Sequence, residues 1–181
     1  IKIDLINYKK NKNFDSQLKI NGNYNKKFGF DFKKITLLSK SNSLIVDDLI
    51  IDKDNKLAKV DKIDLDYFDN ENMKNKFALS RIKNNNYELK GSLLNADTII
   101  TNLLESKNDQ QLDFFKEDIN IKLNLFDVYL DNDNSVKNLN GRIQIIDNKV
   151  DYTNISAQFT NDENLKFTIN TKEGEKITTL S

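Results

Sequence analysis

The sequence contains no cysteine, no histidine and no proline in 181 residues. Without cysteine no disulfide can form, so the thiol content says nothing about the compartment in which the chain folds. The absence of both histidine and cysteine excludes serine–histidine–aspartate triads, cysteine nucleophiles and ordinary zinc sites from this stretch of chain. The absence of proline suits long, uninterrupted ladders of strands, because proline cannot donate a backbone hydrogen bond to a ladder.

Long apolar runs and an excess of one charge are missing as well. No run in these residues approaches the roughly 20 apolar residues of a membrane-spanning helix or has the pattern of a signal peptide, and a parent protein could carry either one upstream of Ile1. Lys+Arg and Asp+Glu number 28 each and are interspersed, so no basic stripe predicts nucleic-acid binding. Since the sequence starts at Ile1 rather than at methionine, we expect it to be a fragment of a longer protein.

What the sequence does contain is a regular alternation of apolar and polar residues between positions 118 and 170. Side chains of a strand point to opposite faces with period two, so this pattern predicts a stack of strands with one apolar face. The alternating apolar residues are Ile119, Ile121, Leu123, Leu125, Ile143, Ile145, Val150, Tyr152, Leu165, Phe167 and Ile169.

The first half of the sequence also predicts a meander of strands. Asn21-Gly22 is a favoured pair for a tight turn, Asp47-Asp48 separates two apolar runs, and polar turns are expected at 52–55 and 84–86. The strand residues that these turns separate are Leu18, Ile20, Phe28, Phe30, Phe32, Leu44–Val46, Leu49–Ile51, Ile63, Leu65, Tyr67, Phe77, Leu79, Tyr87 and Leu89. Strands of five to nine residues at intervals of about ten to twelve indicate a mostly antiparallel β fold.

One segment follows the spacing of a helix. Its apolar residues recur at three and four, and Asn95 or Asp97 can cap its start, which predicts a short amphipathic helix at about 96–106. We therefore divide the chain into a first β block at 1–106, a polar linker at 107–117 and a second β block at 118–181. The helical pattern consists of Leu93, Ala96, Ile99, Ile100, Leu103 and Leu104.

No catalytic or metal-binding constellation emerges, so we predict neither an enzyme nor a cofactor. The runs from Asp131 and from Asp52 begin like calcium loops, but they lack the glycine and glutamate that a helix–loop–helix site requires at its sixth and twelfth positions, and they fit turns better. Asp64 and Asp66 fit the solvated face of a strand. The residues Phe28, Phe30 and Phe32 could stack nucleic-acid bases, but no cationic groove accompanies them, so a core-facing strand is the preferred interpretation.

Several runs resemble the AsmA-like proteins of bacterial envelopes. These are Tyr87-Glu-Leu-Lys-Gly91 with the helix opening near Asp97, Leu139-Asn-Gly141-Arg-Ile143-Gln-Ile145, and Leu165-Lys-Phe167-Thr-Ile169 followed by Glu173-Gly174 and Thr178-Thr179-Leu180. Within that family the chain is most similar to the C-terminal region of the large YhdP-type and DUF3971-type members. The similarity covers residues 44–181 and is a pattern of spacing.

The resemblance implies a long, curved, groove-like sheet on the periplasmic side of the envelope, in a parent protein anchored in the inner membrane. It further implies transport of phospholipid towards the outer membrane, with acyl chains as the partner. An apolar strip is sufficient for such a groove, because each buried CH₂ contributes about 0.8 kcal/mol. The groove residues that we predict are Ile119, Leu123, Ile143, Ile145, Val150, Phe167 and Ile169. The alternative is a β-sandwich interaction module of a secreted or surface protein, in which these residues pack on a second layer.

Overall fold

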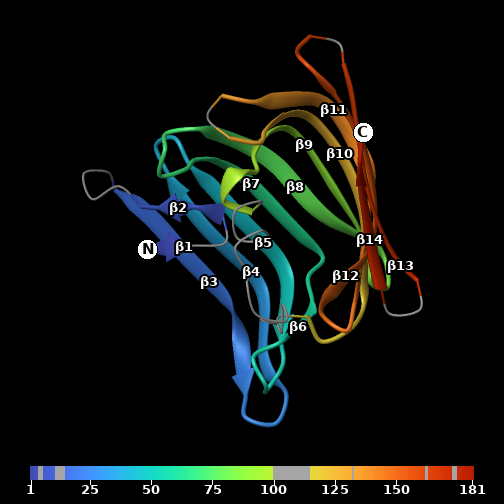
Figure 1. Cartoon of the computed structure of the whole chain (residues 1–181). Helices are drawn as coiled ribbons and strands as arrows, with labels where there is room; N and C mark the ends of the chain where they lie inside the picture. The colour runs from blue at the N-terminus through green and yellow to red at the C-terminus, as the bar shows by residue number, and fades with distance from the viewer. Residues whose placement is uncertain (4–5, 11–14, 100–114, 132, 162, 173–174) are drawn as a thin grey trace.

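The computed structural model describes the chain except for residues 4–5, 11–14, 100–114, 132, 162 and 173–174. Twelve of the described strands form one sheet, in the order β14-β13-β12-β11-β10-β9-β8-β7-β5-β4-β3, with β6 paired to β5 off this path. Figure 1 shows the sheet curving like a trough, with β3 and β14 at its two margins. The prediction of a mostly β, largely antiparallel fold is confirmed, and the sheet is not closed into a barrel.

The strands are long, and their bounds define the elements used below. They are β1 (Lys2–Ile3), β2 (Tyr8–Lys9), β3 (Ser16–Asn25), β4 (Gly29–Ser39), β5 (Ser43–Ile51), β6 (Leu57–Lys59), β7 (Lys62–Phe68), β8 (Lys74–Lys83), β9 (Asn86–Asn95), β10 (Ile119–Tyr129), β11 (Ser135–Ile146), β12 (Lys149–Phe159), β13 (Asn164–Lys172) and β14 (Glu175–Leu180).

The meander is interrupted once, between β9 and β10, which pair in parallel. A parallel pair needs a crossover connection, because the chain must return to the same end of the sheet. Residues 96–118 make that crossover, and the two β blocks of the sequence therefore meet within a single sheet. Asp97–Ile99 are helical, and the backbone N–H of Asp97 donates to Oδ1 of Asn95 at 3.2 Å, as a capping residue requires. The rest of the predicted helix and most of the predicted linker lie outside the described residues.

Strand lengths exceed the predicted five to nine residues because bulges shift the alternation without ending a strand. Leu125 and Val128 are three residues apart, yet both are buried in the same cluster. Val136 and Leu139 on β11 repeat this spacing around Asn138, where the pairing register with β12 shifts. An extra residue in one strand moves the apolar set by one position. Strand β5 also runs through Asp47 and Asp48, which separate two apolar runs in the sequence; Asp48 adopts a φ of 47°, and the register of β5 with β4 is the same on both sides of it.

Asparagine and aspartate take the left-handed backbone positions that glycine usually occupies. All of the non-glycine residues with positive φ in the described chain are Asn or Asp, whose short polar side chains tolerate this conformation best. Asp147 and Asn148, with φ of 48° and 59°, form the two-residue connection between β11 and β12, as a type I′ hairpin requires. The polar turns predicted at 52–55 and 84–86 are confirmed at Asn55 and Asn84.

The tight turn predicted at Asn21-Gly22 is wrong. Strand β3 passes straight through both residues, and the turn to β4 falls at 26–28 instead. Gly22 lies where the register with β4 shifts, and a Cβ there would be 2.6 Å from the backbone O of Asp31. Close approach of the neighbouring backbone therefore explains this glycine, and no reversal of the chain is involved.

Candidate apolar groove

One row of apolar residues crosses the whole sheet on its inner face. Residues directly opposite each other in a ladder share a face, so the pairing register defines the row without reference to burial. At every strand of the main path the residue in register is aliphatic, aromatic or glycine. This long apolar row consists of Ile20, Ile35, Val46, Ile63, Leu79, Leu89, Leu123, Gly141, Ile155, Phe167 and Leu180.

The register places all seven predicted groove residues on this same inner face. Leu123 and Phe167 belong to the long apolar row. Ile143 and Ile169 both pair with Thr153 in the next row, and Ile119, Ile145 and Val150 form the row after that. The period-two pattern thus brings the predicted residues together across β10 to β13.

Burial divides the predicted residues into two groups. Ile119, Leu123 and Ile145 are buried in the core, and Ile143 and Val150 pack against it. Phe167 and Ile169 are half-buried and belong to none of the core clusters of the described residues. The middle of the inner face is therefore filled by the protein itself, whereas its β13 side is partly open.

Side chains from outside the main path of the sheet pack over two of its three core clusters. Tyr8 of β2 is completely buried against Leu37, Leu44, Leu65 and Tyr67. Val60, which follows β6, is buried with Tyr87, Ile119 and Ile145, and Leu57 and Phe115 pack against this group. We call Tyr8, Leu57, Val60 and Phe115 the covering residues. Figure 1 shows β1 and β2 inside the curve of the sheet.

Hydrogen bonds hold the covering residues to both sides of the trough. The N–H of Phe115 donates to Oδ1 of Asn148 in the β11–β12 turn at 2.9 Å, and the N–H of Lys116 donates to the carbonyl of Leu57 at 3.0 Å. The hydroxyl of Tyr67 donates to the carbonyl of Ile6 at 2.8 Å, and burial raises the pKa of Tyr67. These contacts link β6 and the β11–β12 turn, which belong to distant parts of the sheet.

The two ends of the long apolar row remain exposed. Ile20 on β3 is 58% exposed and Leu180 on β14 is 69% exposed. Beside Ile20, the inner face of the β3–β4 hairpin presents Leu18, Tyr24 and Phe30 to solvent. The rings of Phe30 and Phe32 stack at 5.5 Å between centroids, and Tyr24 packs on Phe30 at 4.7 Å. Phe30 and Phe32 share the inner face, but the expectation that Phe28, Phe30 and Phe32 lie on one core-facing strand was wrong: Phe28 lies in the turn before β4 and is exposed, and Phe30 is not covered.

The outer face is charged and carries ion pairs between neighbouring strands. Asp64 and Asp66 lie there as predicted, with Nζ of Lys62 at 2.7 Å from Asp64, and Lys74 and Lys76 paired to Asp66. On β9 and β10, Lys122 pairs with Glu88 at 3.0 Å. The two faces therefore differ in chemistry as strongly as the alternation predicts, with apolar contacts inside and solvated charges outside.

A more sheltered ion pair holds the segment that carries Val60. One carboxylate oxygen of Asp61 lies 3.0 Å from Nζ of Lys59, and the other lies 2.8 Å from Nε of Arg81. Burial raises the pKa of Asp61, but the hydrogen bonds and charges of Lys59 and Arg81 together lower it below its ordinary value. The N–H of Arg81 also donates to the carbonyl of Asp61 at 2.8 Å. These contacts of Asp61 with Lys59 and Arg81 hold the segment that carries Val60 against β8.

A buried polar network, which sequence reasoning missed, joins the β7–β8 turn to the end of β9. Asn75 is completely buried; its Nδ2 donates to Oδ2 of Asp69, and its Oδ1 accepts from the N–H of Asn95 at 2.8 Å. The other oxygen of Asp69 accepts the N–H groups of Glu71 and Met73. Asparagine is so frequent in this chain that no sequence signal distinguishes Asn75 from its surface counterparts.

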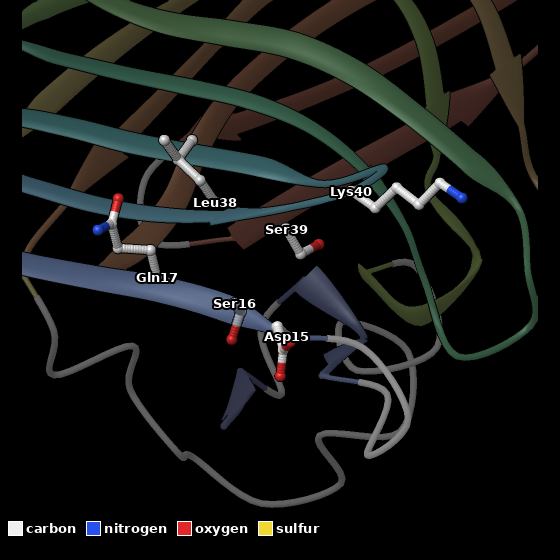
Figure 2. Close-up of a pocket in the computed structure, with 6 residues that line it drawn as sticks. All are labelled: Asp15, Ser16, Gln17, Leu38, Ser39 and Lys40. Carbon is white, nitrogen blue, oxygen red and sulfur yellow. The ribbon is translucent and has the colours of Figure 1, made fainter.

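The hollow shown in Figure 2 has a different character from the apolar face. It has a volume of about 360 Å³ and lies where β3 begins and β4 ends, lined by Asp15, Ser16, Gln17, Leu38, Ser39 and Lys40. Gln17 and Leu38 lie on one side of the two strands, whereas Ser16 and Ser39 lie on the other. Because these side chains do not converge, the hollow has no arrangement for chemistry or for a specific ligand.

The two calcium-like runs form turns between strands. Oδ1 of Asp52 accepts the N–H groups of Asp54 and Lys56, and Oδ1 of Asp131 accepts those of Asp133 and Asn134. The hydrogen bond from the N–H of Lys56 is the largest cause of the lowered pKa of Asp52. The side-chain amide of Asn134, followed by the two N–H groups, lowers the pKa of Asp131. Within the described part of the chain, no three acidic, histidine or cysteine side chains gather as a metal ion would require, and no helix is long and apolar enough to cross a membrane.

Comparison with known proteins adds no relative to this description. No protein-family model matches the chain, and neither the curated proteins nor the solved structures contain a match. The geometry of the inner face is therefore the basis for proposing a function.

Proposed function

We propose that the inner face of this sheet binds phospholipid acyl chains, and that the chain is a segment of an AsmA-like protein that moves phospholipid between the inner and outer membranes. In this proposal the segment lies on the periplasmic side of the envelope and its parent is anchored in the inner membrane. The observation that carries the proposal is the long apolar row, which is unbroken by any polar side chain from Ile20 to Leu180.

The direction of the row suits an extended hydrocarbon chain. Neighbouring strands lie about 4.8 Å apart, so ten intervals give the row a contour of about 48 Å across the sheet. Each CH₂ that leaves water contributes about 0.8 kcal/mol, and the contact needs no specific polar partner. An acyl chain lying across the strands would therefore contact one row side chain at each strand that it crosses.

The exposed ends of the row are the parts that an acyl chain can reach directly. The first contacts therefore lie not at Ile119, Leu123 and Ile145, which are buried, but at the β3–β4 hairpin and at Leu180, with Phe167 and Ile169 beside Leu180. On the hairpin, Leu18, Ile20, Tyr24 and Phe30 supply the apolar surface. Passage along the whole row would require the covering residues to move aside.

The test is extraction of fluorescent phospholipid from vesicles of phosphatidylethanolamine and phosphatidylglycerol by the purified chain. A Tyr24→Glu, Leu180→Glu double variant should extract several-fold less lipid than the wild type. Its matched control is Asn23→Glu with Thr179→Glu, which places the same charges one residue away on the outer face, at positions that are also exposed. Native mass spectrometry should show phospholipid on the wild type and on the control.

Equal extraction by the two double variants would contradict an inner-face lipid site. A wild-type chain that is folded but neither carries nor extracts phospholipid would favour the interaction module, in which the same apolar surface contacts protein.

A further inference from the structure

The edge of the sheet at β3 is unusually unprotected. Among the described strands β3 pairs with β4 alone, so one side of Ser16–Asn25 offers backbone N–H and C=O groups to a further strand. Proteins normally block such edges with proline, short strands, bulges or inward-pointing charges. Strand β3 is ten residues long, and its only charged residue, Lys19, lies on the outer face.

The side chains of β3 indicate which kind of partner would fit. The inner-face residues Leu18, Ile20 and Tyr24 are exposed, and among the described strands only β4 pairs with β3. Leu37, the partner of Leu18 on β4, is buried where Tyr8 packs on it. A further strand would supply both the missing hydrogen bonds and an apolar neighbour for each row. The required partner is therefore an extended strand with alternating apolar residues.

We propose that this partner is the β3 strand of a second copy of the chain, paired antiparallel about a two-fold axis at Asn21. On the inner face this axis places Leu18 opposite the second copy's Tyr24, and Ile20 opposite its Gly22. On the outer face Lys19 meets Asn23, so no like charges oppose each other. The two inner faces then form one continuous surface, because antiparallel partners at an even register keep the same face.

The two-fold arrangement is preferred over pairing of β3 with β14. Strand β14 has six residues against the ten of β3, so it would satisfy fewer backbone groups. A β3–β14 contact is also head-to-tail and adds further copies without closing, whereas a two-fold contact closes as a dimer. The dimer does not depend on lipid binding, and it is tested on lipid-free protein.

Sedimentation and light scattering across a wide range of concentrations should give a mass of twice the 21.0 kDa of one chain. Ile20→Lys places a charge on the inner side of the edge and should give a monomer. Gln17→Lys adds the same charge to the outer face of the same strand and should leave the dimer intact, as should Ile177→Lys on β14. Circular dichroism should show that each variant remains folded, since all three positions are exposed.

Because the chain lacks cysteine, the axis can be located by single-cysteine variants. Asn21→Cys should form a covalent dimer on mild oxidation, since antiparallel partners lie about 4.5–5.5 Å apart at Cα and a disulfide spans that distance. Asn25→Cys, at the end of the strand, should not. A wild type that stays monomeric at every concentration overturns the proposal. Loss of association in Ile177→Lys would overturn it in favour of β3–β14 pairing.

Discussion

The inner face has a buried centre and an exposed margin at β3, although both regions show the same alternation of apolar and polar residues in the sequence. At its centre, Ile145 is 6% exposed beneath Val60, and at the β3 margin Ile20 is 58% exposed with a described strand on one side only. Both are isoleucines on the same face of one sheet, so side-chain chemistry does not distinguish them. The difference comes from what else the chain places over each residue. Apolar alternation thus specifies a face, whereas the covering residues decide whether that face is core or binding surface.

The largest expected effect comes from shortening the same residue in the two regions. Ile145→Ala should lower the free energy of unfolding by about 2–5 kcal/mol, because it leaves a cavity in a packed cluster. Ile20→Ala should change it by about 0.5 kcal/mol or less, as exposed substitutions usually do. Urea unfolding followed by circular dichroism measures both. Similar losses at the two positions would mean that the margin is also buried in solution, as a very stable β3 dimer would cause, so the pair is compared at low protein concentration.

A smaller loss is expected when the buried polar network is opened. Asn75→Ala removes the acceptor for the N–H of Asn95 and a donor to Asp69, and buried groups left without partners cost about 1–3 kcal/mol each. The free energy of unfolding should fall by about 2 kcal/mol in the same assay. Asn124→Ala on the exposed face of β10 is the control and should be nearly neutral. If both variants were neutral, the network would not be what holds the β7–β8 turn to the start of the crossover.

The fold class and the residues that share the inner face could be predicted from the sequence, because both depend on local periodicity. The seven predicted groove residues do share one face, since each follows the period-two rule on its own strand. Strand bounds were less predictable: the spacing of three between Leu125 and Val128 looks like a break in the pattern although β10 continues through it, and Asn21-Gly22 looks like a turn. A spacing of three between apolar residues, seen again at Val136 and Leu139, is the signal that would have revealed continuous strands.

The covering residues could not be predicted, because their position depends on contacts between distant parts of the chain. Nothing near Tyr8 in the sequence indicates that it packs against Tyr67, and Phe115 belongs to a segment that reads as a polar linker. The parallel pairing of β9 with β10 is equally non-local. These three features separate covered core from exposed margin, which is why the lipid contacts that the sequence suggested had to be moved along the face.

The smallest expected effect concerns the ion pair beside Val60, and it depends on pH. The folded chain holds the pKa of Asp61 below its ordinary value of 3.8, so the contribution of this group is complete above the unfolded pKa and is lost as pH falls through the folded pKa. Because the Asp61 side chain is about one-third exposed, we expect about 1 kcal/mol or less. The free energy of unfolding of Asp61→Asn should therefore lie below that of the wild type at neutral pH and converge with it as the pH falls from the unfolded pKa through the lower folded pKa of Asp61. If the difference persisted at acid pH, Asp61 would act through its packing. In that case the charges of Lys59 and Arg81 would not be what fixes Val60 over the centre of the inner face.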